Sequence, residues 1–170
     1  MTLAFSTQLN GKPTYFVEKI CKSLRELCPP LINPLAKAHT VIRLSVYHQC
    51  NSKNHTIRAD EKDRWQPGKL IHFVINNRTK NRLQFAPVVP VVSTQKIKIH
   101  WFGESRSLQA SKLAPFRFNY VDVVIDGNVM TINQVTELAQ NDGFDSIEDF
   151  FTYFKTDFKG KIIHWTDLKY

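Results

Sequence analysis

The chain has 170 residues, of which 42% are hydrophobic and 22% charged, a composition typical of a globular domain that excludes an intrinsically disordered chain. The formal net charge of +8 is unevenly distributed, because residues 1–120 hold 19 basic and 6 acidic side chains, whereas residues 121–170 hold 4 and 9. This asymmetry predicts a surface that attracts polyanions, with nucleic acid as the expected partner, and the alternative is a basic surface that only aids solubility.

The N-terminal half of the sequence predicts one helix followed by several short strands. The helix is indicated by four apolar residues at helical spacing, Phe16, Ile20, Leu24 and Leu27. The Pro29-Pro30 pair ends this helix, and the β-branched segment Thr40–Tyr47 predicts a strand. A short extended segment at His55–Arg58 and a turn at Gln66–Gly68 then lead into a further strand with the sequence KLIHFVI.

The next segments predict three more strands. Val88–Val92 is apolar and rich in β-branched residues, and Pro90 favours an edge strand or a bulge there. Lys96–Trp101 alternates with a period of two, which predicts a half-buried strand with a cationic outer face. The segment RFNYVDVVI predicts another strand, which ends in a tight turn at Asp126–Asn128.

The C-terminal part predicts two short helices and a last strand. The segment TINQVTELAQ predicts a helix that ends near Asp142, where Gly143 suits a left-handed cap. Asp145 is expected to open the second helix, with Glu148 as its capping partner. The buried stripe of this helix is expected to contain Phe144, Ile147, Phe150, Phe151 and Phe154. The segment KIIHW is the expected final strand.

The order of these elements predicts an α+β fold. About six short strands with helices near both ends of the chain favour a small mixed β-barrel with helices packed outside it. The sequence has no internal repeat and no Gly/Ser-rich linker, so residues 1–170 are expected to form a single domain.

Cysteine and histidine usage predicts neither a cofactor nor a metal site. Cys21, Cys28 and Cys50 are odd in number and lack CxxC spacing, and the six histidines include no helical i/i+4 pair. The N-terminus lacks the apolar stretch of a signal peptide, and no run approaches membrane-spanning length. We therefore expect a cytoplasmic protein with no membrane partner.

The segment KNHTIR carries residue types that favour chemistry or ligand binding. If it is extended, Thr56 and Arg58 share one face, and Lys53 can turn toward Thr56 if it precedes the strand. A partly desolvated Lys beside a Thr hydroxyl offers a base and a nucleophile, and Arg58 can hold a phosphate or carboxylate by paired hydrogen bonds. The alternative is a solvated polar edge strand.

Three segments together resemble the ASCH domain of the PUA-like superfamily. They are KxHTIR, the following RWQPGKLIHF, and an acidic residue before Gly ahead of a Phe-rich helix and a terminal strand. The family pattern is Gly-x-Lys-x-x-(Glu/Thr)-x-Arg, whose last three places fall on Lys53, Thr56 and Arg58, while Asn51 stands where Gly is usual. The resemblance implies a small PUA-like mixed β-barrel with flanking helices.

One branch of that family is an amidohydrolase that acts on acetylated cytidine. It uses a Lys, a Thr three residues later and a distant Glu at the start of a helix, which by resemblance correspond to Lys53, Thr56 and Asp142. Thr56, or a water that it orients, would attack the acyl carbonyl, with Lys53 as base and Asp142 as proton shuttle. Other members resemble ribonucleases or RNA-binding modules, so the resemblance leaves the reaction open.

The binding hypothesis uses cationic and aromatic side chains near this segment. The residues expected to contact phosphates are Arg58, Arg64, Arg78, Lys80, Arg82, Lys96 and Lys98. Trp65 is a candidate for stacking on a base, whereas Trp101 shares parity with Ile97 and Ile99 and is assigned to the core. The preferred hypothesis is therefore binding of RNA or a modified nucleoside in a cationic cleft beside Lys53, Thr56 and Arg58, with amidohydrolase or ribonuclease activity as the alternative.

Overall fold

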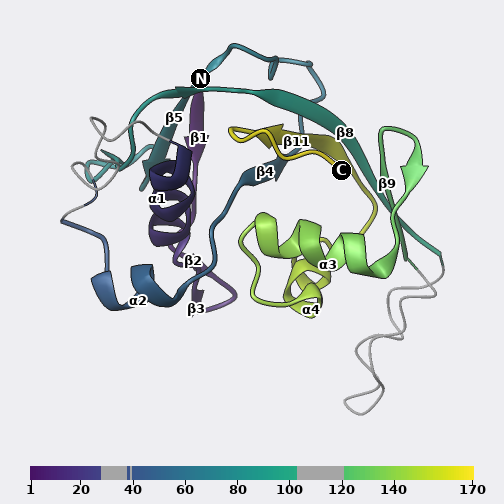
Figure 1. The fold of residues 1–170 in the computed structure, drawn as a ribbon, viewed down its shortest axis with the longest axis horizontal. Helices are drawn as coiled ribbons and strands as arrows, with labels where there is room; N and C mark the ends of the chain where they lie inside the picture. The colour runs from purple at the N-terminus through teal and green to yellow at the C-terminus, as the bar shows by residue number, and fades with distance from the viewer. Residues whose placement is uncertain (28–37, 39, 103–120) are drawn as a thin grey trace.

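The computed structural model describes residues 1–27, 38, 40–102 and 121–170. In these residues the chain is a mixed α+β protein with four helices and three sheets. Figure 1 shows the strands as an arch over the helices, with α1 under one end and α3 and α4 under the other. The expected connection at 29–40 and part of the segment before Val121 lie outside the described residues.

The elements in chain order are β1 (Thr2–Ala4), β2 (Gln8–Leu9), β3 (Lys12–Pro13), α1 (Phe16–Leu27), α2 (Leu44–Gln49), β4 (His55–Arg58), β5 (Leu70–Ile75), β6 (Leu83–Gln84), β7 (Val89–Pro90), β8 (Ser93–Trp101), β9 (Val121–Ile125), β10 (Asn128–Val129), α3 (Ile132–Asn141), α4 (Ile147–Tyr153) and β11 (Phe158–His164).

The largest sheet is antiparallel, with the strand order β10-β9-β8-β11-β4. A second sheet contains β1, β5, β6 and β7, in which β1 runs parallel to β5, and β2 with β3 forms a separate hairpin. The strand pairings among the described residues do not form a closed barrel, because β4 and β10 remain the edges of the largest sheet. The structure therefore supports the α+β class, and the PUA-like barrel stays a prediction.

Two hydrophobic cores lie on opposite faces of β11. Ile162 belongs to a core formed with α3 and α4, whereas the next residue, Ile163, belongs to a core formed with α1 and β5. Successive side chains of a strand point to opposite faces, so β11 and its neighbour β4 separate the two cores. Ile57 and Thr56 of β4 pair with Ile162 and Ile163 respectively, which gives β4 the same two-sided burial.

Most predicted elements are confirmed, including the strands at 70–75, 93–101 and 158–164 and the helices that begin at Phe16 and Ile132. The capping box of α3 forms between Thr131 and Gln134. Gly143 follows the helix with φ of +90°, the left-handed conformation expected there.

The strand predicted at Thr40–Tyr47 is wrong, because Leu44–Gln49 is the helix α2. Glu18 of α1 accepts a hydrogen bond from the backbone N–H of Arg43 at 2.9 Å, and Arg43 is the N-cap of α2. A tertiary contact therefore satisfies a backbone N–H at the start of this helix, and the helix forms although the segment is rich in β-branched residues.

The predicted start of the last helix is also wrong by one residue. Ser146, not Asp145, is the N-cap of α4, and its side chain accepts from the backbone N–H of Asp149. Asp145 instead forms an ion pair with Lys19 at 2.6 Å. Within the described residues, no helix combines the length and the apolar character needed to span a membrane.

Candidate functional site

Lys53 and Asp142 form a buried ion pair at the edge of β4. The ammonium Nζ of Lys53 lies 2.7 Å from Oδ1 of Asp142, and it also donates to the backbone carbonyl of Asp142. Lys53 precedes β4, and Asp142 is the C-cap of α3, so the contact joins the sheet to the C-terminus of a helix. The structure thus brings together two of the three residues predicted to be catalytic.

Two aromatic rings lie beside the Lys53 side chain. Its side chain is 1% exposed, and its ammonium lies 4.8 Å from the centre of the Phe16 ring and 6.0 Å from that of Phe5. Burial lowers the pKa of Lys53 to about 8, although the Asp142 carboxylate acts in the opposite direction. A Lys with a pKa in this range is suited to general-base chemistry near neutral pH.

Asp142 is also held by groups of β4 itself. Its Oδ1 accepts a hydrogen bond from the backbone N–H of Ile57 at 3.2 Å and lies 3.7 Å from Nδ1 of His55. Burial alone would raise the pKa of Asp142, but the Lys53 ammonium and His55 lower it below its ordinary value. The carboxylate therefore stays ionised and fixes the free edge of β4 against α3.

Thr56 and Arg58 point to the same face of β4, but neither reaches Asp142. The buried Thr56 side chain lies beside Ile163, and within the described residues it forms no hydrogen bond with Lys53 or Asp142. Arg58 donates from Nη2 to the carbonyl of Ala4 at 2.8 Å, and its guanidinium lies 5.2 Å from the centre of the Phe5 ring. Arg58 thus connects β4 to β1 through one of its donors, while its buried Nε has no hydrogen-bond partner in the described part of the chain.

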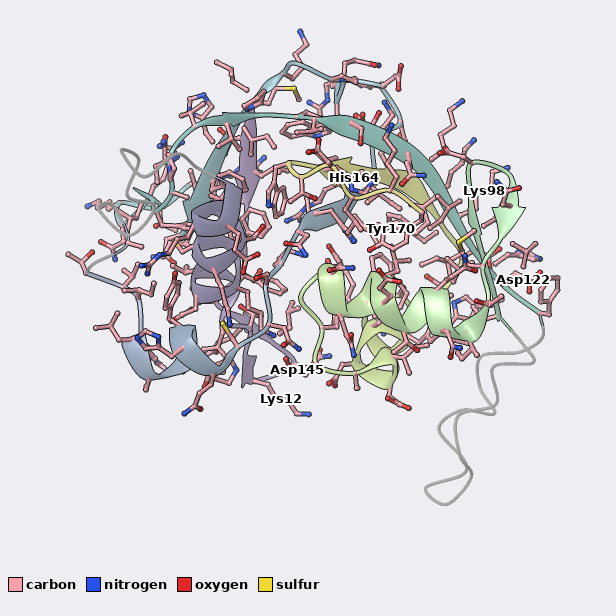
Figure 2. All side chains as sticks on the ribbon, viewed as in Figure 1. Lys12, Lys98, Asp122, Asp145, His164 and Tyr170 are labelled. Carbon is pink, nitrogen blue, oxygen red and sulfur yellow. The ribbon has the colours of Figure 1, made fainter. Side chains whose placement is uncertain are left out.

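A second polar cluster, which sequence reasoning missed, lies on the opposite face of β4. Ser93, His164 and His55 are aligned across β8, β11 and β4, and the Tyr170 hydroxyl hydrogen-bonds to Nε2 of His55 at 2.8 Å. Figure 2 shows Tyr170 between the sheet and α3. Both ring nitrogens of His164 and the Ser93 hydroxyl are buried without a hydrogen-bond partner in the described part of the chain.

Cations gather on the outer face of β8 and β11. Lys98 is directly opposite Lys159, and Lys96 is directly opposite Lys161. Directly opposed residues of an antiparallel pair point to the same side, and Lys96, Lys98 and Lys159 are all exposed. We call these three residues the lysine face. The sequence alone did not indicate Lys159 as a phosphate contact, because its position opposite Lys98 depends on the strand register.

Lys161 differs from the lysine face because the loop 60–65 neutralises it. Its ammonium contacts Asp63, lies 3.7 Å from Asp60 and donates to the backbone carbonyl of Trp65 at 2.7 Å. The Lys161 contact lowers the pKa of Asp63. Arg64 is exposed on this same loop, where its Nε lies 4.0 Å from Oδ1 of Asp60, and its role in phosphate binding stays a prediction.

Two sequence predictions about nucleic-acid contacts do not agree with this arrangement. Trp65 is 5% exposed and belongs to the core around α1 and β5, so its ring cannot stack on a base as predicted. The loop that connects β5 to β6 carries three exposed cations, but it does not lie beside the lysine face. Figure 1 shows β5 at one end of the arch and β9, which pairs with β8, at the other. These three residues are Arg78, Lys80 and Arg82.

The described residues contain no group of three or more His, Cys, Asp or Glu side chains arranged to hold a metal ion. Comparison of this chain with models of protein families, with curated proteins and with solved structures finds no match.

Proposed function

We propose that this chain is an ASCH-like domain of PUA-like architecture that binds RNA or a modified nucleoside, and that the lysine face holds the phosphates when the ligand is RNA. The observation that carries the proposal is the register that places Lys98 opposite Lys159. Like charges directly opposite each other destabilise a sheet, and the lysine face has no ion pair with any described residue. A polyanion would supply the missing countercharge.

The uneven charge of the chain supports the same proposal. Lys96 and Lys98 of the lysine face and Arg64 belong to the strongly basic residues 1–120, whereas the acidic residues of α3 and α4 lie on the other side of the large sheet. The anionic partner is thus attracted to the outer face and repelled from the helical face. Three phosphate contacts at a slope of about −0.7 each predict that single-stranded RNA binds about 20-fold more weakly at 200 mM salt than at 50 mM.

The experiment is a titration of fluorescently labelled single-stranded RNA followed by anisotropy at several salt concentrations. Reversal of two charges, Lys98→Glu with Lys159→Glu, is expected to remove most of the binding and to flatten its salt dependence. The matched control is Arg25→Glu with Lys169→Glu, which changes the net charge equally at exposed positions outside the lysine face. Equal loss in both variants, or no RNA binding by the unmodified chain at 50 mM salt, would count against the proposal.

Amide hydrolysis is the second candidate, and the buried contact between Lys53 and Asp142 favours it. The resemblance assigns a Lys to the base and a Glu to the proton shuttle, and here Lys53 contacts Asp142, a shorter carboxylate 89 positions away in the sequence. The lowered pKa of Lys53, about 8, suits a base. In this mechanism Thr56, or a water that it orients, attacks the acyl carbonyl, Lys53 accepts the proton of that nucleophile, and Asp142 passes the proton to the amine as the C–N bond breaks. When Thr56 is the nucleophile, water then hydrolyses the acyl-threonine ester, which releases acetate and restores Thr56.

This second candidate is tested by acetate release from acetylated cytidine in the presence of excess protein. Thr56→Ala is expected to abolish release and to leave RNA affinity unchanged, because Thr56 is buried away from the lysine face. Asp142→Glu restores the residue type of the family and is expected to retain activity. Absence of acetate release by the unmodified chain after prolonged incubation would eliminate the hydrolase and leave the RNA-binding proposal intact.

A further inference from the structure

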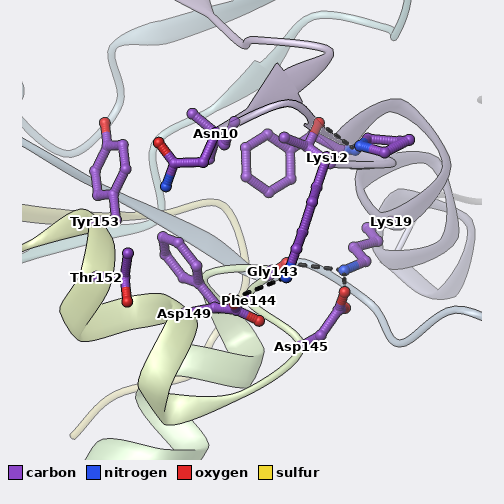
Figure 3. Close-up of a pocket in the computed structure, with 13 residues that line it drawn as sticks. Asn10, Lys12, Lys19, Gly143, Phe144, Asp145, Asp149, Thr152 and Tyr153 are labelled. Atoms are coloured by element: carbon purple, nitrogen blue, oxygen red, sulfur yellow. Dashed lines mark hydrogen bonds and ion pairs between the residues drawn. The ribbon is translucent and has the colours of Figure 1, made fainter. Parts of the chain in front are cut away.

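A cavity of about 290 Å³ lies between the β2–β3 hairpin and the connection from α3 to α4. Figure 3 shows its lining, which comes from the hairpin, from the first turns of α1, from the α3–α4 connection and from α4. The volume is at the lower end of the range for small-molecule sites, about 300–1,000 Å³. None of the residues predicted from the sequence to contact a ligand lines this cavity.

Aromatic side chains form much of the cavity wall. Phe16, Phe144 and Tyr153 all line it, and the rings of Phe144 and Tyr153 lie 5.6 Å apart with an angle of 49° between their planes. Tyr153 is one of the large side chains that remain exposed in the described residues. Flat apolar walls of this kind bind planar rings by stacking and by excluding water.

Several polar groups of the lining are free to bind a ligand. The Asn10 amide and the Thr152 hydroxyl form no hydrogen bond with any described residue, and both line the cavity. Asp149 accepts a hydrogen bond from Ser146 Oγ through Oδ2, but its Oδ1 contacts only Lys12 at 3.9 Å, and the Asp149 and Lys12 side chains are 47% and 81% exposed. By contrast, the buried Lys19 is already committed, because its ammonium donates to the Gly143 carbonyl and to Asp145.

The charges of the lining favour a ligand with no net charge. Lys12 and Lys19 balance Asp145 and Asp149, so the cavity neither attracts nor neutralises a phosphate. An ionised carboxylate only accepts hydrogen bonds, and an Asn amide both donates and accepts. Asp149 with Asn10 therefore suits a ring that carries an amino group beside an acceptor nitrogen, the pattern shared by adenine and cytosine.

We infer that this cavity binds an uncharged nucleoside whose base carries an amino group, adenosine or cytidine. The base lies against the aromatic side chains, Asp149 accepts from its amino group, and Asn10 donates to the neighbouring ring nitrogen. This inference is independent of RNA binding at the lysine face, because the two surfaces share no residue. Each can fail without the other.

The cavity also adjoins the buried ion pair, because Phe16 and Gly143 both line the cavity and both lie beside Lys53. Gly143 lines the cavity, and a Cβ added there would lie 3.0 Å from Cδ of Lys53 and 3.0 Å from Cε1 of Phe16. The absence of a side chain at this position therefore keeps the wall between the cavity and Lys53 thin. A nucleoside bound in the cavity would lie next to the Lys53–Asp142 pair.

The test is calorimetric titration of the full chain with two matched pairs of nucleosides. Cytidine and uridine differ in an amino group replaced by a carbonyl, as do adenosine and inosine. We expect the amino-bearing member of each pair to bind at least about tenfold more tightly, because the carbonyl would face the Asp149 carboxylate with no proton to share. Absence of binding by all four nucleosides up to about 10 mM, or equal affinities within each pair, would overturn the inference.

Two variants locate the binding within the cavity. Asp149→Asn and Tyr153→Ala are each expected to weaken cytidine binding about tenfold. The matched control for the first is Glu148→Gln, which removes the same charge from an exposed neighbour that does not line the cavity and is expected to leave affinity unchanged. Circular dichroism checks that each variant is folded. Cytidine affinity that is unchanged in both Asp149→Asn and Tyr153→Ala would contradict the assignment.

Discussion

The ammonium of Lys53 lies 2.7 Å from the carboxylate of Asp142, and both side chains are buried although 89 positions separate them in the sequence. This ion pair joins the start of β4 to the end of α3, so it connects the sheet that separates the two cores to the helices on one side of it. Both charges are removed from water, so each is stabilised in the folded protein mainly by the other.

The first prediction concerns the loss of one member of this pair. Lys53→Met leaves the Asp142 carboxylate buried without its partner, and Asp142→Asn leaves the ammonium buried, so each change is expected to lower the free energy of unfolding by about 3–5 kcal/mol. The double variant is expected to cost at least about 1 kcal/mol less than the sum, because it leaves no unpaired buried charge. Urea unfolding of the four proteins measures this coupling.

The comparison for that cycle is the exposed pair of Lys12 and Asp149, which is 3.9 Å apart. Lys12→Met is expected to change the free energy of unfolding by less than about 1 kcal/mol, because water screens an exposed ion pair. Strict additivity of Lys53→Met and Asp142→Asn would show that the two side chains do not interact in the folded protein.

The second prediction is a loss of stability in mild acid that depends on His164. Burial, with the neighbouring charges of His55 and Lys169, lowers the pKa of His164 to about 3 from an ordinary value of 6.5. The unfolded chain therefore takes up a proton below pH 6.5 that the folded chain does not. The free energy of unfolding is expected to fall by up to about 1.4 kcal/mol for each pH unit between 6.5 and about 3.

Replacement of this histidine separates its contribution from that of the carboxylates. Asp142 has a lowered pKa, so the stability it supplies is present above its ordinary value of 3.8 and is lost only as the pH falls further. Unfolding curves between pH 4.5 and 7 therefore isolate the histidines. His164→Gln is expected to flatten this pH dependence, and His48→Gln, at an exposed position of α2, is expected to retain it. The same slope in both variants would contradict the prediction.

Local patterns in the sequence predicted the parts of the fold that depend on local physics. The alternation of Lys96–Trp101 predicted a strand with cations on one side, and Lys96 and Lys98 do lie exposed on β8. The glycine after α3 was predicted from its capping role, and Gly143 has the left-handed backbone. The family resemblance named Lys53 and Asp142 together, and these two residues are in contact.

Features that depend on tertiary contacts were missed. The burial of Lys19 is one of them, because α1 places its ammonium against the Gly143 carbonyl and Asp145, which lie far away in the sequence. In place of the strand predicted at Thr40–Tyr47 the structure has the helix α2, and Glu18 accepts a hydrogen bond from the backbone N–H of its N-cap residue. Strand register alone placed Lys159 opposite Lys98 and His164 opposite His55, and no single stretch of sequence contains that information.

The third prediction follows from the burial of Trp65. Its ring belongs to the core around α1 and β5, and its carbonyl accepts a hydrogen bond from Lys161. Trp65→Ala is expected to lower the free energy of unfolding by about 3–5 kcal/mol, whereas Phe102→Ala, at an exposed ring, is expected to cost less than about 1 kcal/mol. Trp65→Phe is expected to leave RNA affinity unchanged, and a large loss of affinity in this folded variant would restore Trp65 as a stacking residue.

The fourth prediction concerns Gly160, where β11 approaches the end of β4 too closely for any side chain. A Cβ at Gly160 would lie 2.3 Å from the backbone carbonyl oxygen of Arg58 and 2.8 Å from ring atoms of Phe158, so the backbone itself must move to accept one. Gly160→Ala is therefore expected to lower the free energy of unfolding by about 2 kcal/mol or more. Gly127→Asn is the comparison, because Gly127 has a positive φ but open space around it, and Asn tolerates that backbone at a cost of about 1 kcal/mol. Urea unfolding that ranks the two variants in the opposite order would show that β4 and β11 are not held at this separation.

A shift of β4 along β11 would also move Arg58 from its position opposite Lys161, so Gly160→Ala is expected to weaken the contact between Arg58 and Ala4 as well.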